Sequence, residues 1–177
     1  MLNKGADINM ANKNGDTALI LAVYRGAGVE IIETLIDCGA EVNRVNNYGD
    51  GPLSVALYLG YGAYSNLFLL KGADVNKANI YGQTPLFRQA SIGNDYFIIE
   101  LINNGTDVNV VDINGETPVF IAVRKSQFMA VKILLANGAD INLVNVECMT
   151  PIIYAICLDN FLLEKYILNI ITNSKII

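Results

Sequence analysis

The feature that most constrains the fold is an internal repeat of 33 or 34 residues, marked by two sets of positions that recur in phase. A Gly-Ala-Asp-like motif, followed by asparagine four residues after its glycine, begins at Gly5, Gly39, Gly72, Gly105 and Gly138. A second motif, of Thr-Pro-Leu type, begins at Thr17, Gly51, Thr84, Thr117 and Thr150. Because both sets keep one period, we expect stacked units, each packing on its neighbours, instead of a single central core.

Each repeat predicts a helix, a turn and a second helix. Threonine is a good N-cap, and proline at the next position has a suitable φ and no N–H to leave unpaired, so the first helix begins there. A second apolar stretch ends at the repeat glycine, which suits the left-handed conformation after a helix. Segments such as residues 75–82 then end in Asn/Gly turn chemistry, which predicts a projecting hairpin-like finger.

The Thr-Pro-Leu signature, the Gly-Ala-Asp-Val-Asn close and the period together resemble the ankyrin repeat family over nearly the whole chain. The resemblance implies an all-α repeat solenoid, an ankyrin-like stack of helix-turn-helix units with projecting β-hairpin-like fingers. It also implies that the fingers and first helices line a concave face that grips other proteins. We expect one ankyrin repeat domain over residues 1–177, with the tail of a partial repeat at 1–11 and repeats at 12–45, 46–78, 79–111, 112–144 and 145–177.

One position departs from its column. Alanine recurs on the first helices at Ala22, Ala56, Ala122 and Ala155, where neighbouring helices approach closely, but the third repeat has Gln89 there. A buried glutamine needs hydrogen-bond partners for its amide. Tolerated packing is favoured over a function for this residue.

Composition argues against several functional classes. The formal charge is −5, with 12 basic and 17 acidic side chains and no basic run, so neither nucleic acid nor a membrane is expected as a partner. The chain has no histidine, which removes the common Ser/His/Asp and Cys/His arrangements. Its glycines lie at repeat junctions and its three cysteines are irregularly spaced, so we predict no enzyme, no metal site and no cofactor.

The same features predict a location. No segment has the apolar pattern of a signal peptide or a membrane span, and three cysteines are too few for a disulfide framework. We therefore expect a cytoplasmic protein, or one in the cytosol of a host cell if it is a secreted effector.

Candidate partner-binding residues lie at the finger tips and on the first helices. In two adjacent finger columns, Tyr48 is expected to stand beside Tyr81, and Ile80 beside Ile113, as an exposed strip of anchors. The alternative is that these side chains only shield neighbouring finger backbones. On the first helices the exposed candidates are Tyr24, Tyr58, Arg124 and Lys125, of which the two basic residues could receive an acidic group or simply be solvated.

The sequence thus favours a protein-protein interaction module that binds a partner protein, of unknown identity, through its concave face and finger tips, as a regulator or effector. The alternative is a structural spacer segment of a larger multidomain protein. The last repeat carries apolar residues such as Phe161 and Leu162, which raises the hypothesis of self-association through this end of the chain.

Overall fold

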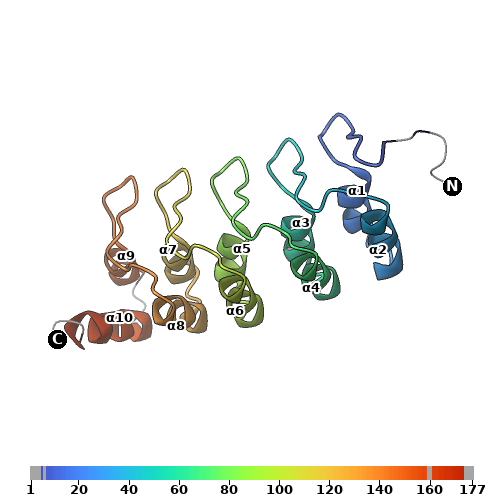
Figure 1. Ribbon diagram of the computed structural model, residues 1–177. Helices are drawn as coiled ribbons and strands as arrows, with labels where there is room; N and C mark the ends of the chain where they lie inside the picture. The colour runs from blue at the N-terminus through green and yellow to red at the C-terminus, as the bar shows by residue number, and fades with distance from the viewer. Residues whose placement is uncertain (1–4, 6, 159–160, 174–177) are drawn as a thin grey trace. The chain divides into compact units, whose positions relative to one another are not determined.

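The computed structural model describes Gly5, residues 7–158 and residues 161–173; residues 1–4 and 6 of the predicted partial repeat and 174–177 of the last repeat lie outside this part. The described residues form ten α-helices and no β-strand, in two compact units, Met1–Ile80 and Tyr81–Ile177 (Figure 1). The prediction of an all-α repeat fold is confirmed.

The first unit contains two helix pairs. Its helices are α1 (Ala18–Tyr24), α2 (Val29–Asp37), α3 (Pro52–Leu59) and α4 (Gly62–Leu70). Within the pairs α1 packs on α2 and α3 on α4, while between the pairs the first helices, α1 and α3, lie against each other, as do α2 and α4. Ile20, Ile32 and Phe68 are fully buried between these layers, so each pair completes its core on its neighbour.

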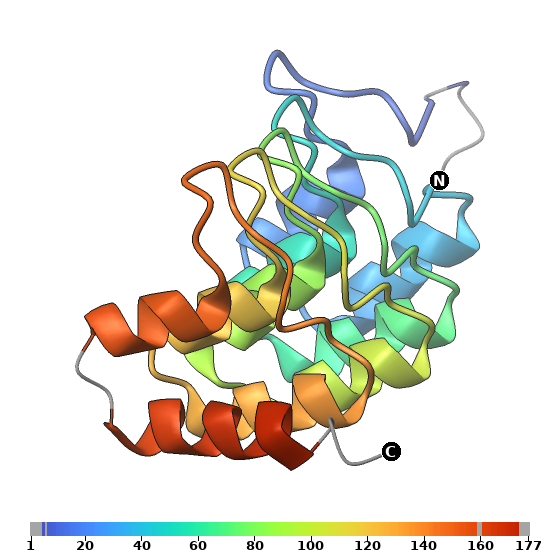
Figure 2. The same ribbon diagram turned by 90° about the vertical axis from the view of Figure 1, so that its left-hand side faces the viewer.

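The second unit repeats the arrangement three times. Its helices are α5 (Pro85–Ile92), α6 (Asp95–Asn103), α7 (Pro118–Arg124), α8 (Phe128–Ala136), α9 (Pro151–Cys157) and α10 (Phe161–Asn173). The first helices pack in the order α5, α7, α9, and α6 packs on α8. Within each unit the fingers extend from the first helices on the side away from the second helices (Figures 1 and 2).

The first helices begin where the sequence predicts. The Oγ1 atoms of Thr17, Thr117 and Thr150 each accept a hydrogen bond of 3.3 Å from the backbone N–H three residues ahead. Gly51 has no side chain, and there Ser54 Oγ accepts from the backbone N–H of Gly51 at 2.9 Å instead. Every first helix thus has a residue of the Thr-Pro-Leu motif at its N-cap, which fixes where the preceding finger must end.

Asparagines after the repeat glycines join neighbouring repeats. The side chain of Asn43 donates from Nδ2 to the carbonyl of Gly72 at 3.2 Å and accepts at Oδ1 from the N–H of Asp74 at 2.7 Å. Asn109 makes the same pair of bonds in the second unit, to Gly138 and Asp140 at 3.0 and 2.7 Å. The asparagine that recurs once in every repeat therefore has a structural role, since its side chain joins two neighbouring loops by hydrogen bonds.

Gln89 is fully buried on α5, and neither Nε2 nor Oε1 has a hydrogen-bond partner among the described residues. The amide therefore lacks the hydrogen-bond partners that a buried glutamine needs. Ala56, Ala122 and Ala155, in the same column, are also fully buried but carry no polar atom to satisfy. Burying an unpaired amide costs folding free energy, so Gln89 weakens its repeat.

Candidate partner-binding face

The fingers are tight turns, and in four of them a single asparagine or aspartate side chain bonds the turn. Oδ1 of Asn46 accepts hydrogen bonds from the backbone N–H groups of Tyr48 and Asp50, both at 3.0 Å. In the second unit Asp112 does the same for Asn114 and Glu116, at 2.8 and 3.0 Å. The bonding side chain lies inside the turn. The residue two positions after it, such as Tyr48, is therefore left at the outer tip of the finger.

Glycines let neighbouring fingers approach each other. Gly49 has φ +79°, and a Cβ on it would lie 2.6 Å from the Cα of Asn79 in the next finger. Gly115 has φ +71°, with the corresponding contact, to the Cα of Asn145, at 3.2 Å. Both positions require glycine for its left-handed φ, and Gly49 also because no side-chain atom fits against the neighbouring backbone.

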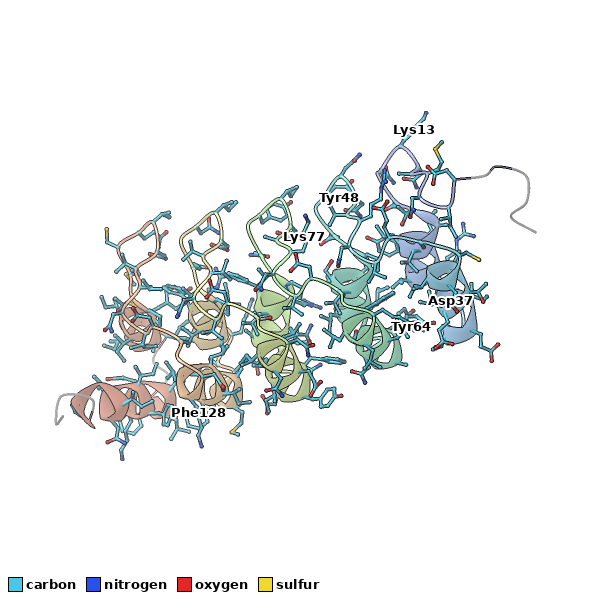
Figure 3. All side chains as sticks on the ribbon, viewed as in Figure 1. Lys13, Asp37, Tyr48, Tyr64, Lys77 and Phe128 are labelled. Carbon is cyan, nitrogen blue, oxygen red and sulfur yellow. The ribbon has the colours of Figure 1, made fainter. Side chains whose placement is uncertain are left out.

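Backbone hydrogen bonds then set which finger residues are neighbours. In the first unit the N–H of Ile80 donates to the carbonyl of Tyr48 at 2.9 Å, and in the second the N–H of Ile113 donates to the carbonyl of Tyr81 at 3.0 Å. Each unit therefore pairs one tyrosine with one isoleucine across two fingers. All four side chains are exposed, Tyr48 by 55%, and Figure 3 shows Tyr48 near the tip of its finger.

The pairing continues to a residue that was not among the predicted anchors. The N–H of Val146 donates to the carbonyl of Asn114 at 2.9 Å, and the Val146 side chain is 71% exposed. Its position in the same column as Ile80 and Ile113 is the signal that could have identified it. Hydrogen-bonded finger tips in the second unit thus expose Tyr81, Ile113 and Val146.

We call the exposed side chains of the fingers and first helices of a unit its inner face. Tyr24 ends α1 and is 43% exposed, and Tyr58, on α3, is more exposed still. Lys125 follows α7 and is exposed as well. Tyrosine supplies a large contact area with a polar end, which is typical of residues that anchor interfaces.

Arg124 has a partner within the chain. Its Nη1 donates to Oε1 of Glu116 at 3.3 Å and its Nη2 lies 3.1 Å from Oε2, while the Glu116 side chain is only 6% exposed. Burial raises the pKa of Glu116, Arg124 opposes this rise, and Asp112 and Glu147 add to it. Sequence reasoning missed this ion pair, although the alignment of repeats places both residues in fixed columns.

The corresponding acid of the second repeat, Asp50, has a different environment. Its pKa is raised by burial, and among the described residues no cation forms an ion pair with it. The pKa of Tyr24 is raised as well, first by burial and then by the carboxylates of Asp50 and Asp16, while a hydrogen bond with Asn46 opposes the rise. Tyr24 therefore lies close enough to the second finger for the charge of Asp50, at the base of that finger, to raise its pKa.

The last repeat exposes an apolar edge. Ile153 and Ile156 on α9 are exposed, although the same columns hold fully buried Ile20 and Val23 in the first repeat. Phe161 and Leu162 at the start of α10 are exposed as well. Self-association through this edge stays a prediction.

The described residues also bear on metal sites and membrane spans. The described residues contain no group of three or more histidine, cysteine, aspartate or glutamate side chains placed to hold a metal ion. Across the same residues, none of the helices has the length and apolar character that a membrane crossing demands. Cys38, Cys148 and Cys157 are free and exposed.

The family model for ankyrin repeats, in three copies, matches residues 1–79, 62–145 and 86–175. The chain belongs to the ankyrin repeat family. Ankyrin repeats are generally protein-protein interaction modules and typically not enzymes. A search of curated proteins finds no match to this ankyrin repeat chain.

Proposed function

We propose that this ankyrin repeat protein binds a partner protein through the inner faces of its units, and acts as a regulator or effector by occupying a surface of that partner. The observation that carries the proposal is the tyrosine-isoleucine pair at neighbouring finger tips, Tyr48 with Ile80 and Tyr81 with Ile113. Exposed aromatic and aliphatic side chains on a rigid, hydrogen-bonded support lose little conformational freedom on binding, which favours affinity.

The arrangement of the first helices supports the same face. Tyr24 ends α1 and Tyr58 lies in the last turn of α3, and these two first helices of the first unit pack on each other. Lys125 stands at the corresponding end of α7, where it adds a positive charge to the inner face of the second unit. Arg124 joins this face through its half-exposed guanidinium, although Glu116 already binds it.

The proposal includes a cytoplasmic location for the protein. Three free and exposed cysteine thiols persist most readily in a reducing compartment. Secretion into the cytosol of a host cell would provide the same conditions.

The test is capture of the natural partner from lysate by the full chain, followed by measurement of the dissociation constant for purified variants. Replacement of Tyr48 and Ile80 together by alanine is expected to weaken binding at least about 100-fold, as for two anchors at the centre of an interface. The melting temperature should stay nearly unchanged, because both side chains are more than half exposed.

The matched control is Leu70→Ala, at the end of α4, where the side chain is 85% exposed and lies off the inner face. It should leave the dissociation constant within about twofold of the wild type. A partner that binds the Tyr48→Ala/Ile80→Ala variant as tightly as the wild type, but loses affinity for Leu70→Ala, would place the binding surface on the second helices instead.

A further inference from the structure

One column of the repeat carries an acid whose partner differs between repeats. The residue just before the N-cap of each first helix is Asp16, Asp50, Gln83, Glu116 or Met149. The residue eight positions later, near the end of that helix, is Tyr24, Tyr58, Ser91, Arg124 or Cys157. In the fourth repeat these two columns form the ion pair of Glu116 with Arg124. In the first two repeats the acid is kept and tyrosine replaces the arginine.

The two acids of the first unit are not equivalent. The carboxylate of Asp16 is buried and accepts hydrogen bonds from Asn46 Nδ2 at 3.0 Å and from Asn12 Nδ2 at 3.3 Å. Asp50, by contrast, bonds Asn46 only through its backbone N–H and carbonyl, and among the described residues its carboxylate has neither a hydrogen bond nor an ion pair. The half-buried carboxylate of Asp50 therefore carries a charge that the first unit does not neutralise.

Three exposed tyrosines belong to the neighbourhood of this carboxylate, by contact or by their place in the repeat. Tyr24, from α1, lies close enough to Asp50 and to Tyr48 to interact with both electrostatically. Tyr58 has the position relative to Asp50 that Arg124 has relative to Glu116, and its helix packs on that of Tyr24. A carboxylate next to exposed tyrosine rings is a favourable environment for a cation, which can form an ion pair and lie on the ring faces.

We propose that the Asp50 site, made of Tyr24, Tyr48, Asp50 and Tyr58, receives an arginine or lysine side chain of the partner protein. The partner's cation takes, on Asp50, the role that Arg124 has on Glu116 within the fourth repeat. The formal charge of −5 favours approach of a basic surface. This inference rests on the proposed function, because it names the chemistry that the inner face of the first unit selects in its partner.

The first experiment needs no natural partner. The full chain is titrated with N-acetylarginine amide and, separately, with N-acetylcitrulline amide, which has nearly the same shape without the charge, while NMR follows the tyrosine rings and the Asp50 carboxyl carbon. We expect weak, saturable binding of the arginine probe, on the order of millimolar, that moves the Tyr24, Tyr48 and Asp50 signals. The citrulline probe should move them far less.

Two variants locate the binding. Asp50→Asn should weaken the arginine probe roughly tenfold, whereas the matched control Glu33→Gln, on the exposed side of α2, should leave it unchanged. Tyr58→Arg should place an arginine of the chain itself on Asp50 and so exclude the probe. Equal responses to the arginine and citrulline probes, or undiminished binding to Asp50→Asn, would overturn the inference.

Binding of the natural partner to the same variants distinguishes failure of this inference from failure of the proposed function. A partner that loses affinity for Tyr48→Ala/Ile80→Ala but binds Asp50→Asn as tightly as the wild type supports the function and removes the inferred cation. If Asp50→Asn weakens the partner, substitution of one basic residue of the partner should show no further loss in that variant, because the two changes remove the same ion pair. Two fully additive losses would also overturn the inference.

Discussion

The second and fourth repeats each have a partly buried carboxylate, but the side chains around it differ. Each has an acid at the base of its finger, Asp50 or Glu116, and burial raises the pKa of both. The fourth repeat places Arg124 on its acid. The second repeat has tyrosine in the arginine column, and within the described part of the chain its carboxylate has no ion pair. The difference suggests that the fourth repeat is optimised for internal stability, and that the second keeps an interaction available for another molecule.

The fingers of these two repeats also differ in how closely they pack on the next finger. The contact that a Cβ would make is 2.6 Å at Gly49 and 3.2 Å at Gly115. The backbone of the second finger, which carries Tyr48, therefore approaches that of its neighbour more closely. A rigid support of this kind suits a binding surface, since less motion is lost when a partner docks.

The largest expected effect tests this difference in packing. Gly49→Ala combines a left-handed φ with a contact no side chain can make, and should lower the free energy of unfolding by about 3 kcal/mol. Gly115→Ala shares the φ but has a milder contact, and should cost about 1.5 kcal/mol. Urea unfolding of both variants checks the order, with Gly39→Ala, whose Cβ would contact nothing within 4 Å, as the control for φ alone. Equal losses at Gly49 and Gly115 would show that the neighbouring finger moves aside.

Breaking the ion pair of the fourth repeat should have an intermediate effect on the free energy of unfolding. Arg124→Ala leaves the buried carboxylate of Glu116 without its cation, and should lower the free energy of unfolding by about 2 kcal/mol, less than for a fully buried pair because Arg124 is 37% exposed. The double variant Glu116→Gln/Arg124→Ala should recover part of this loss, since no charge is then buried. Urea unfolding at neutral pH measures both, and a double variant less stable than the single one would contradict the comparison.

The smallest effect has the opposite sign and comes from the second repeat. Asp50→Asn removes a carboxylate that burial disfavours, so the variant should be more stable than the wild type at neutral pH, by no more than about 0.5 kcal/mol. The folded-state pKa of Asp50 lies above the ordinary value of 3.8, so the wild type loses stability relative to the variant as the pH rises from 3.8 through that raised pKa.

Thermal unfolding from pH 3 to pH 7 measures this difference for the two proteins. The melting temperatures should coincide at the acid end and separate in favour of Asp50→Asn at neutral pH. A variant that is less stable than the wild type at pH 7 would mean that Asp50 is ionised and bonded within the fold, as Asp16 is.

The sequence by itself determined the repeat, the helix starts and the finger turns. Threonine caps, glycines at left-handed positions and asparagines that close turns act on backbone atoms a few residues away, so their effect is legible in the spacing alone. The candidate face followed in part from the same columns, which placed Tyr48, Ile80, Tyr81 and Ile113 at finger tips. Five helix pairs follow from five copies of one local pattern.

Only the tertiary structure decided which side chains meet. Arg124, at the end of α7, reaches Glu116, which directly precedes the N-cap of the same helix. Tyr24 interacts with Asp50 because α1 packs on α3, the first helix of the repeat that carries Asp50. The same packing buries Gln89 without a hydrogen bond and leaves the carboxylate of Asp50 without a cation. These outcomes depend on distances between side chains from separate segments, which the docking of helices sets and the period of the sequence does not encode.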